Sequence, residues 1–227
     1  MTGPGLSVAA PRPWNPARRV RAAEFAFLFV ALPLFAGWQG EVFKRWVIPQ
    51  ILVLGTLTLA LLWNDPTFDR RRLRFWSGGA LRGARRVLRL FAAGACALLV
   101  LVAAMLDGRI FSLPAANPAL WGTVMLLYPV LSAGPQELAF RVFFFHRYRI
   151  LFPGPRSMIA ANAATFALAH LQLGNPIAPA MSLVGGALFA YTYLRSRSLA
   201  LVSLEHALWG DWIFTVGMGS FFYGGHF

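Results

Sequence analysis

The sequence predicts an all-α protein, a polytopic transmembrane helix bundle of seven to eight helices. Composition is the first observation that leads there: of 227 residues, 58% are hydrophobic and only 13% are charged. Soluble domains have roughly half apolar and about a quarter charged residues. The second observation is the recurrence of six long apolar runs, since a membrane span needs about 20 mostly apolar residues. A soluble helical protein could bury one or two such runs, but not six.

With their polar flanks included, the apolar stretches predict seven crossings. They lie near 22–40, 46–63, 88–107, 119–150, 157–172, 177–194 and 199–219. The stretch 119–150 is too long for one simple helix at 1.5 Å per residue. Because proline removes an amide donor and clashes with the preceding turn, we expect Gly134-Pro135 to break it. Counting the two halves separately gives eight helices.

The basic residues are unevenly distributed between the predicted loops. The net charge is +13, and all 21 basic residues except Lys44 are arginine. A cytoplasmic N-terminus puts 17 of them inside and three outside, as the positive-inside rule favours. The arginine clusters then contact anionic lipid headgroups, and no nucleic acid partner is expected. We therefore predict a multi-pass integral membrane protein. Its arginine-rich composition is typical of proteins of the bacterial inner membrane.

The chain divides into three regions on this basis. Residues 1–21 form a basic cytoplasmic tail, and residues 22–107 form the N-terminal transmembrane helices. Between the second and third spans lies a basic cytoplasmic loop at 64–89, whose alternating basic and apolar residues favour a position along the membrane interface. The remaining helices, at 119–220, carry the polar residues that are informative about function.

Ionisable residues gather inside the predicted spans of this last region. An ionisable group at the bilayer centre costs at least about 2.5–3.5 kcal/mol by insertion scales, so such residues are rare and usually functional. Six of them in one region indicate a shared polar cavity. They are Glu137, Arg141, His170, Glu205, His206 and Asp211.

The spacing of these residues indicates a type of chemistry. Glu137 and Arg141 are four apart, so on a helix they share a face and can pair. Phe166 and His170 have the same spacing on another span, and His206 lies on the last one. A carboxylate flanked by two imidazoles can deprotonate a water, while an imidazole or arginine stabilises the developing oxyanion. The same Glu137, His170 and His206 could instead hold zinc.

Three motifs in this order resemble the CPBP family of intramembrane proteases, which includes the CAAX prenyl endopeptidases. They are Gln136-Glu137-Leu-Ala-Phe-Arg141, Phe166-x-x-x-His170 and His206, against EExxxR, FxxxH and HxxxN or HxxxD in the family. The resemblance covers about residues 119–220. It implies hydrolysis of a peptide bond within or near the bilayer, with Glu137 activating water and the two histidines supporting it. The implied partner is a membrane-anchored protein or peptide substrate.

Two positions depart from the family motifs. Gln136 stands where the family has its first glutamate, and Gly210 stands four residues after His206. Asp211 comes one position later, which moves its side chain by about 100° on an ideal helix. A π-bulge near Gly210 would bring Asp211 back to the site. Gln136, Asp211 and Glu205 are accordingly treated as supporting candidates.

Plainer interpretations of the same residues stay open. Glu137 and Arg141 can form a structural ion pair, and either histidine can be a packing residue. For the whole protein, the alternatives are a non-catalytic membrane scaffold or bacteriocin-immunity protein of the same fold, or a small transporter. Between the two chemical versions, we expect a glutamate mechanism without a cofactor rather than a zinc site, because no acid neighbours His170 to orient it.

Overall fold

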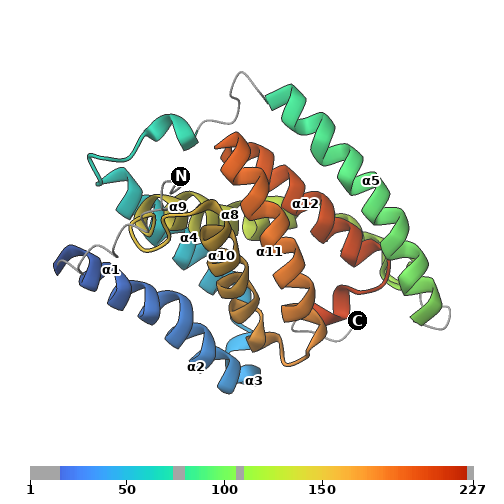
Figure 1. Cartoon of the computed structure of the whole chain (residues 1–227). Coiled ribbons are helices and arrows are strands. Elements are labelled where there is room, and N and C mark those ends of the chain that lie inside the picture. Colours follow the sequence, from blue (N-terminus) through green and yellow to red (C-terminus); the bar gives the residue numbers. More distant parts are fainter. Residues whose placement is uncertain (1–15, 74–79, 106–109, 224–227) are drawn as a thin grey trace, which may run out of the picture.

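The computed structural model describes residues 16–73, 80–105 and 110–223, and within these ranges the chain is helical without a strand. The expectation of an all-α bundle is confirmed (Figure 1). The N-terminal part comprises α1 (Pro16–Ala26), the π-helical turn η1 (Phe27–Ala31), α2 (Leu32–Trp38), α3 (Gly40–Lys44), α4 (Val47–Trp63), η2 (Arg70–Leu73), α5 (Ala80–Met105) and α6 (Ser112–Ala116).

The second half supplies the rest of the bundle. One long helical stretch runs through α7 (Pro118–Tyr128), η3 (Pro129–Ala133), α8 (Gly134–Glu137), η4 (Leu138–Phe143) and α9 (Phe144–Arg147), and we call it the central helix. It is followed by α10 (Pro155–Ala169), η5 (Leu171–Leu173), α11 (Ile177–Ser196), α12 (Leu199–Thr215) and η6 (Gly219–Phe221). The helices overlap all seven predicted spans, although α5 begins at Ala80 rather than near residue 88.

The central helix continues through Gly134-Pro135, so the break expected there is wrong. The reason lies in η3, where the backbone adopts a π-helical turn just before the proline. The amide of Gly134 bonds to the carbonyl of Pro129, five residues back rather than four. Local π adjustments of this kind let a membrane helix accommodate proline without ending. A second π-helical turn, η4, follows directly after Glu137.

The central helix is flanked by other helices of the bundle. It packs between α4 and α12, while α11 packs between α10 and α12 (Figure 1). Glycine permits a close approach of α10 and α11: a Cβ on Gly186 of α11 would lie 3.1 Å from the Cα of Ala163 in α10. On the outer side, α5 packs against α12, where Gly94 faces the ring of Trp209. Small residues at helix contacts are typical of membrane bundles.

Polar contacts tie the first helix and one loop to the end of the central helix. Glu24 of α1 accepts hydrogen bonds from Nε and Nη2 of Arg147 at 2.8 Å each, and from the Tyr148 hydroxyl at 2.9 Å. Asp65, in the loop after α4, bonds to Thr67 and to His146. The Thr67 hydroxyl and then the His146 contact lower the pKa of Asp65 to about 2.

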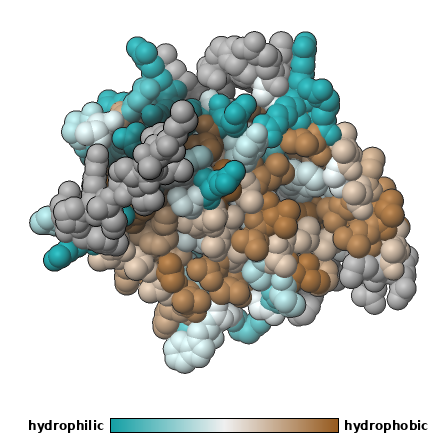
Figure 2. All heavy atoms as spheres, viewed as in Figure 1, coloured by the Kyte–Doolittle hydropathy of each residue, from teal (hydrophilic) through white to brown (hydrophobic). Residues whose placement is uncertain are grey.

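Much of the outer surface of the bundle is apolar. Val100 of α5 and Val184 of α11 are 70% and 72% exposed, and Figure 2 shows hydrophobic residues spread over the middle of one face with hydrophilic ones along its upper edge. Exposed apolar patches of this extent mark a membrane-facing surface. Within the described ranges, the helices long and apolar enough to span a bilayer are Pro16–Trp38, Gly83–Ala104 and Ile177–Ser196, and Val47–Trp63 is a shorter apolar one.

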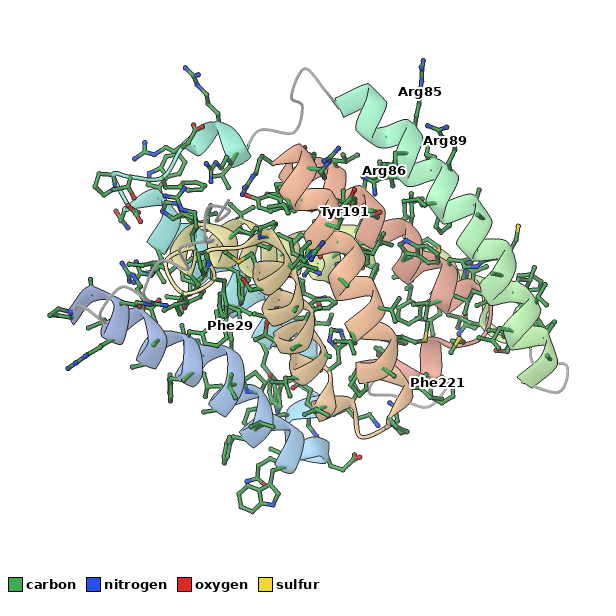
Figure 3. All side chains as sticks on the ribbon, viewed as in Figure 1. Phe29, Arg85, Arg86, Arg89, Tyr191 and Phe221 are labelled. Carbon is green, nitrogen blue, oxygen red and sulfur yellow. The ribbon has the colours of Figure 1, made fainter. Side chains whose placement is uncertain are left out.

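The basic segment expected as a loop at 64–89 is only partly a loop. Residues 74–79 lie outside the described part, and the chain is helical again from Ala80, as the start of α5. Figure 3 shows Arg85, Arg86 and Arg89 along this first part of α5. The guanidinium of Arg86 lies 4.4 Å from the ring centre of Tyr191 on α11, a cation–π contact that holds the helix end against the bundle.

Candidate active site

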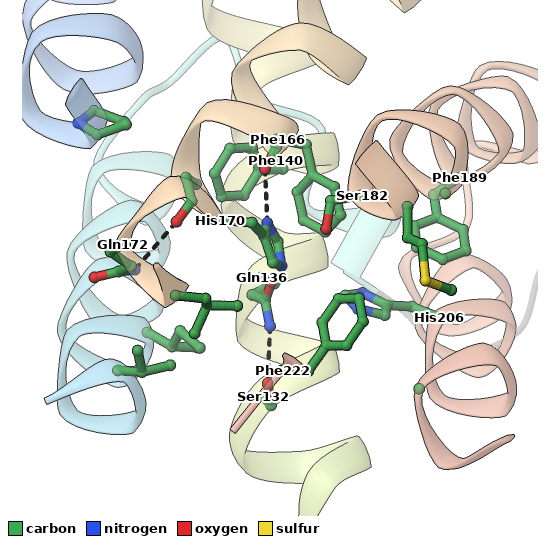
Figure 4. Close-up of a pocket in the computed structure, with 18 of the residues that line it drawn as sticks. Ser132, Gln136, Phe140, Phe166, His170, Gln172, Ser182, Phe189, His206 and Phe222 are labelled. Atoms are coloured by element: carbon green, nitrogen blue, oxygen red, sulfur yellow. Dashed lines mark hydrogen bonds between the residues drawn. The ribbon is translucent and has the colours of Figure 1, made fainter. Parts of the chain in front are cut away.

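A cavity of about 740 Å³ lies inside the bundle, between η1, α2, α4, α10, α11, α12 and the central helix. Most of its walls are aliphatic and aromatic side chains. Polar groups come mainly from the central helix, α12 and the residues that follow α10 (Figure 4). Those that reach the cavity are Gln50, Tyr128, Ser132, Gln136, His170, Gln172, Ser182 and His206.

Glu137 lies behind this wall rather than in it. Its side chain is fully buried, and it contacts two other candidate residues. Oε1 lies 2.7 Å from Nδ1 of His206, and Oε2 lies 3.1 Å from Nε of Arg141. The expected pairing of Glu137 with Arg141 is therefore confirmed. The carboxylate meets the cavity through His206, and this arrangement was not anticipated from spacing alone.

Arg141 is also fully buried, and it balances the charge of Glu137. Its contact with the carboxylate is an ion pair without hydrogen-bond alignment, and within the described part of the chain none of its three guanidinium nitrogens has a hydrogen-bond partner. Two aromatic faces cover it instead, with ring centres 4.3 Å (Phe166) and 5.3 Å (Phe189) away. A buried charge is tolerable only when paired. The pair therefore depends on both of its members.

Both ring nitrogens of His206 are engaged. Nδ1 faces the carboxylate of Glu137, and Nε2 lies 3.0 Å from the hydroxyl of Tyr128. A carboxylate can only accept a hydrogen bond, so Nδ1 carries the proton and Nε2 accepts one from the phenol. The ring stacks on Phe189 at 4.7 Å, which fixes its plane. The result is a chain of three side chains, Tyr128 to His206 to Glu137, that begins at the cavity and ends in the protein interior.

His170 approaches the same cavity from the end of α10. Its Nδ1 lies 2.7 Å from the carbonyl oxygen of Phe166, four residues earlier. Because that oxygen can only accept, Nδ1 carries the proton, and Nε2 has a free lone pair. The ring of Phe166 packs edge-on against both imidazoles, with ring centres 4.7 Å (His170) and 5.6 Å (His206) apart. Phe166 therefore positions the two histidines and covers Arg141 as well.

The remaining candidates differ in where they lie. Gln136 lines the cavity, and its amide donates to the hydroxyl of Ser132 at 2.8 Å. Glu205 is fully buried away from the cavity, with Thr192 and Arg141 among its neighbours. Asp211 does not line the cavity either, because α12 is a regular α-helix from Leu199 to Thr215, although it lies close enough to Tyr128 for an electrostatic interaction. The π-bulge that would have brought Asp211 to the site is absent from α12.

Tyr128 is the functional candidate that sequence reasoning missed. It is the last residue of α7, inside an apolar run, and a tyrosine in such a run does not stand out in an isolated sequence. The available signal was Gly210, whose position packs directly against the Tyr128 ring. Asn162 of α10 donates to the carbonyl of Phe140 in the π-helical turn η4. This bond fixes the backbone of the segment that carries Arg141.

The zinc alternative can be compared with this arrangement. Among the described residues, no three His, Cys, Asp or Glu side chains lie close enough together to hold a metal ion. Glu137 and His206 are bonded to each other, and Nε2 of His206 faces a phenol. A zinc-binding imidazole must instead direct one nitrogen lone pair at the metal. The donor set as arranged here does not fit a zinc ion.

Comparison with known proteins supports the motif assignment. Residues 117–210 match the family model described as type II CAAX prenyl endopeptidase Rce1-like. This segment is an Rce1-like domain. Searches of curated proteins and of solved structures found no match. The Rce1-like segment runs from the start of α7 to Gly210 of α12, so it includes the central helix, His170 and His206, while Ile213 and Phe214 of α12 line the cavity beyond its end.

The Rce1-like match bears on the family and the activity of the segment that it covers. It is consistent with the CPBP resemblance, so the expected family is confirmed for this segment. The family implies protease activity, and in general terms that of an intramembrane CAAX endopeptidase. Together with the apolar helices, it identifies an integral membrane protein.

Proposed function

We propose that this protein is an intramembrane endopeptidase that hydrolyses a peptide bond of a membrane-anchored protein or peptide in the cavity. One observation carries the proposal: the imidazoles of His170 and His206 line an apolar cavity, and a buried carboxylate stands directly behind one of them. Apolar walls suit a substrate whose anchor is a lipid chain or a hydrophobic segment. The polar groups at one side then meet its peptide bond.

In this proposal Glu137 acts through His206. Its carboxylate orients the imidazole and stabilises the positive charge that the ring gains when Nε2 accepts a proton from water. His170 lines the cavity, and its Nε2, which is unprotonated because Nδ1 carries the proton, can accept a hydrogen bond from the attacking water. Arg141 neutralises Glu137 and does not reach the cavity. This differs from direct deprotonation of water by Glu137, because His206 stands between the carboxylate and the cavity.

We propose that the mechanism needs no metal. The support is the pairing of Glu137 with His206, which uses donor atoms that a zinc ion would require. Exhaustive chelation of the purified protein should therefore leave cleavage unchanged. Loss of cleavage with chelator, followed by its return with added zinc, would contradict this part of the proposal.

The bilayer is the second proposed partner, through its anionic headgroups. A small polar hollow near the Asp65 loop is lined by Arg21, Arg72, Arg147, Arg149 and Arg197, with Asp65 as its only acid among the described residues. Burial, and then the nearby Arg72 and Arg149, lower the pKa of Arg197. Phosphate groups of anionic lipids would offset this concentration of positive charge.

One observation favours a second candidate function. Position 136, at the start of the first motif, lines the cavity, and its side chain is an amide with its nitrogen bonded to Ser132. An amide cannot accept a proton as a general base. A non-catalytic protein that binds an apolar chain in the same cavity would show this feature, and it would bind the peptides described next without cleaving them.

The test uses the full chain in lipid nanodiscs. Peptides carrying an isoprenoid chain, an acyl chain or a hydrophobic C-terminal segment are incubated with the protein, and the products are identified by mass spectrometry. The proposal predicts cleavage of at least one class, and its loss with His206→Ala and with His170→Ala. Tight binding without cleavage by the wild-type protein would support the second candidate and contradict the first.

A further inference from the structure

The volume beside Gly210 is filled by a residue from another helix. On α12, the side chain four residues after His206 would lie on the same face, one turn along. Here that residue is glycine, and a Cβ built on it would collide with the ring and hydroxyl of Tyr128, closer than the 3.0 Å that real contacts respect. Glycine at position 210 is therefore required for Tyr128 to occupy its present place.

The placement gives the Tyr128 hydroxyl a defined direction. Its ring packs edge-on against Phe214 at 5.7 Å and against His206 at 5.9 Å, and these contacts hold it from two sides. The hydroxyl reaches Nε2 of His206 at 3.0 Å, and Tyr128 lines the cavity. A polar hydrogen thus stands at the cavity wall, next to the nitrogen that would take the proton of water.

We propose that Tyr128 is a catalytic residue of this chain, which donates its hydrogen bond to the carbonyl oxygen of the scissile peptide bond, and that Gly210 is present to admit it. The inference rests on the endopeptidase function proposed above. It assigns the oxyanion-stabilising group that this site needs to a residue outside the three motifs. Gly210 carries no side chain that could do so from α12.

Hydrolysis at this site takes place in two halves, and the first forms the tetrahedral intermediate. Without substrate, the phenol donates to Nε2 of His206 and covers it. When a peptide carbonyl lies against the phenol, the O–H turns toward the carbonyl oxygen and uncovers Nε2. A water then gives one proton to Nε2 while its oxygen bonds to the carbonyl carbon, and the C=O electron pair moves onto the oxygen that Tyr128 stabilises. Glu137 stabilises the imidazolium through Nδ1.

The second half returns every group to its starting state. The electron pair on the oxyanion re-forms the C=O bond, and the C–N bond breaks. The imidazolium of His206 gives its proton to the departing nitrogen, which leaves as an amine. The phenol then returns to Nε2. One water is consumed, one carboxyl and one amino terminus are formed, and no other reactant is needed.

Tyr128→Phe is the first test. The ring keeps its contacts with Phe214 and His206, and only the hydroxyl is lost. We expect kcat to fall about 10²–10³-fold, the cost of removing one oxyanion-hole donor, with little change in KM. Tyr148→Phe is the matched control, because its hydroxyl also makes a hydrogen bond, to Glu24, but does not line the cavity. Its kcat should stay at the wild-type value.

Substitutions at position 210 test the role of Tyr128 independently. Gly210→Ala should displace the phenol and reduce kcat to a similar extent, although it leaves all three motifs intact. In a Tyr128→Ala background, Gly210→Asn places an amide in the vacated volume, one turn from His206. We expect this double variant to be at least about tenfold faster than Tyr128→Ala alone, since it restores one oxyanion donor. If the double variant is no faster than Tyr128→Ala, the group in this volume does not act as a hydrogen-bond donor to the oxyanion.

The outcomes separate this inference from the proposed function. If the wild-type protein and Tyr128→Phe cleave with equal kcat while His206→Ala is inactive, the endopeptidase stands and the role of Tyr128 is wrong. If Tyr128→Phe changes KM but not kcat, the hydroxyl binds substrate without stabilising the oxyanion, and the inference also fails. If the wild-type protein cleaves none of the peptide classes, the proposed function fails, and the inference fails with it.

Discussion

Replacing Glu137 with glutamine should affect both stability and activity, because the carboxylate contacts two groups with different roles. Toward Arg141 it is the counter-charge of a guanidinium that is fully buried and covered by Phe166 and Phe189. Toward His206 it holds Nδ1 at 2.7 Å. Glutamine keeps the size of the side chain but removes the charge from both contacts.

The size of the stability loss in Glu137→Gln follows from the burial of Glu137 and Arg141, and the size of the activity loss follows from the contact with His206. Removing one partner of a buried ion pair costs about 3–5 kcal/mol, because the other charge is left without compensation. The exposed fraction is zero for both Glu137 and Arg141, so no water screens the remaining guanidinium. For activity, loss of the carboxylate behind a catalytic histidine costs about 10⁴-fold in kcat in serine proteases, and we expect a loss of that order here.

A double variant separates the two effects. Glu137→Gln with Arg141→Met removes both charges and should recover most of the lost stability, measured as thermal unfolding in detergent, while cleavage stays abolished. The corresponding ion pair between Glu24 and Arg147 is partly exposed, so Glu24→Gln serves as the control with a smaller loss of stability. If Glu137→Gln is as stable as the wild type, Glu137 does not stabilise the fold as the counter-charge of Arg141. Cleavage restored in the double variant would refute the role of Glu137 in positioning His206.

Three further predictions concern the fold. The pKa of Asp65 is about 2 in the folded protein against about 3.9 in an unfolded chain, so the ionised carboxylate stabilises the fold above about pH 4, and this stabilisation is lost as the pH falls toward about 2. The melting temperature of Asp65→Asn should therefore decrease less than that of the wild type across this acid range. Equal decreases would contradict this role of Asp65. Gly186→Ala should destabilise the fold by about 1–3 kcal/mol in thermal unfolding, since its Cβ would meet the backbone of Ala163. The control Gly122→Ala, whose Cβ meets nothing within 4 Å, should not destabilise the fold. Unchanged stability of Gly186→Ala would be inconsistent with the close approach of α10 and α11. Reporter fusions after Arg82 and after Phe227 should report the cytoplasmic and the external side, and the same side for both would contradict seven crossings.

Much of the fold was predictable because apolar length determines where membrane helices begin and end. The predicted spans 46–63 and 177–194 agree within a few residues with α4 and α11. The error at Gly134-Pro135 has a local cause: the rule that proline ends a helix omits the π-helical turn that absorbs it. No pattern of residue types marks such a turn. Membrane orientation, the bacterial origin and the number of crossings stay predictions.

The candidate site was predictable in its members more than in its geometry. Helical spacing correctly paired Glu137 with Arg141, because that contact lies within one helix. Spacing could not show that Glu137 meets His206, 69 residues later, since this depends on how the central helix packs against α12. It also could not show that Gln136, rather than Glu137, faces the cavity. Tyr128 was missed for the same reason, because its partners His206 and Gly210 lie on another helix.

The most direct measurement of the central claim follows the oxygen atom of water. The protein in nanodiscs is incubated with a cleavable anchored peptide in ¹⁸O-labelled water, and the mass of the product that carries the new carboxyl terminus is measured by mass spectrometry. Hydrolysis by a water activated at His206 predicts one ¹⁸O atom in the product of the wild-type protein and no product from His206→Ala under single-turnover conditions. A labelled product formed equally fast by His206→Ala, or no product from the wild-type protein with any anchored peptide, would contradict it.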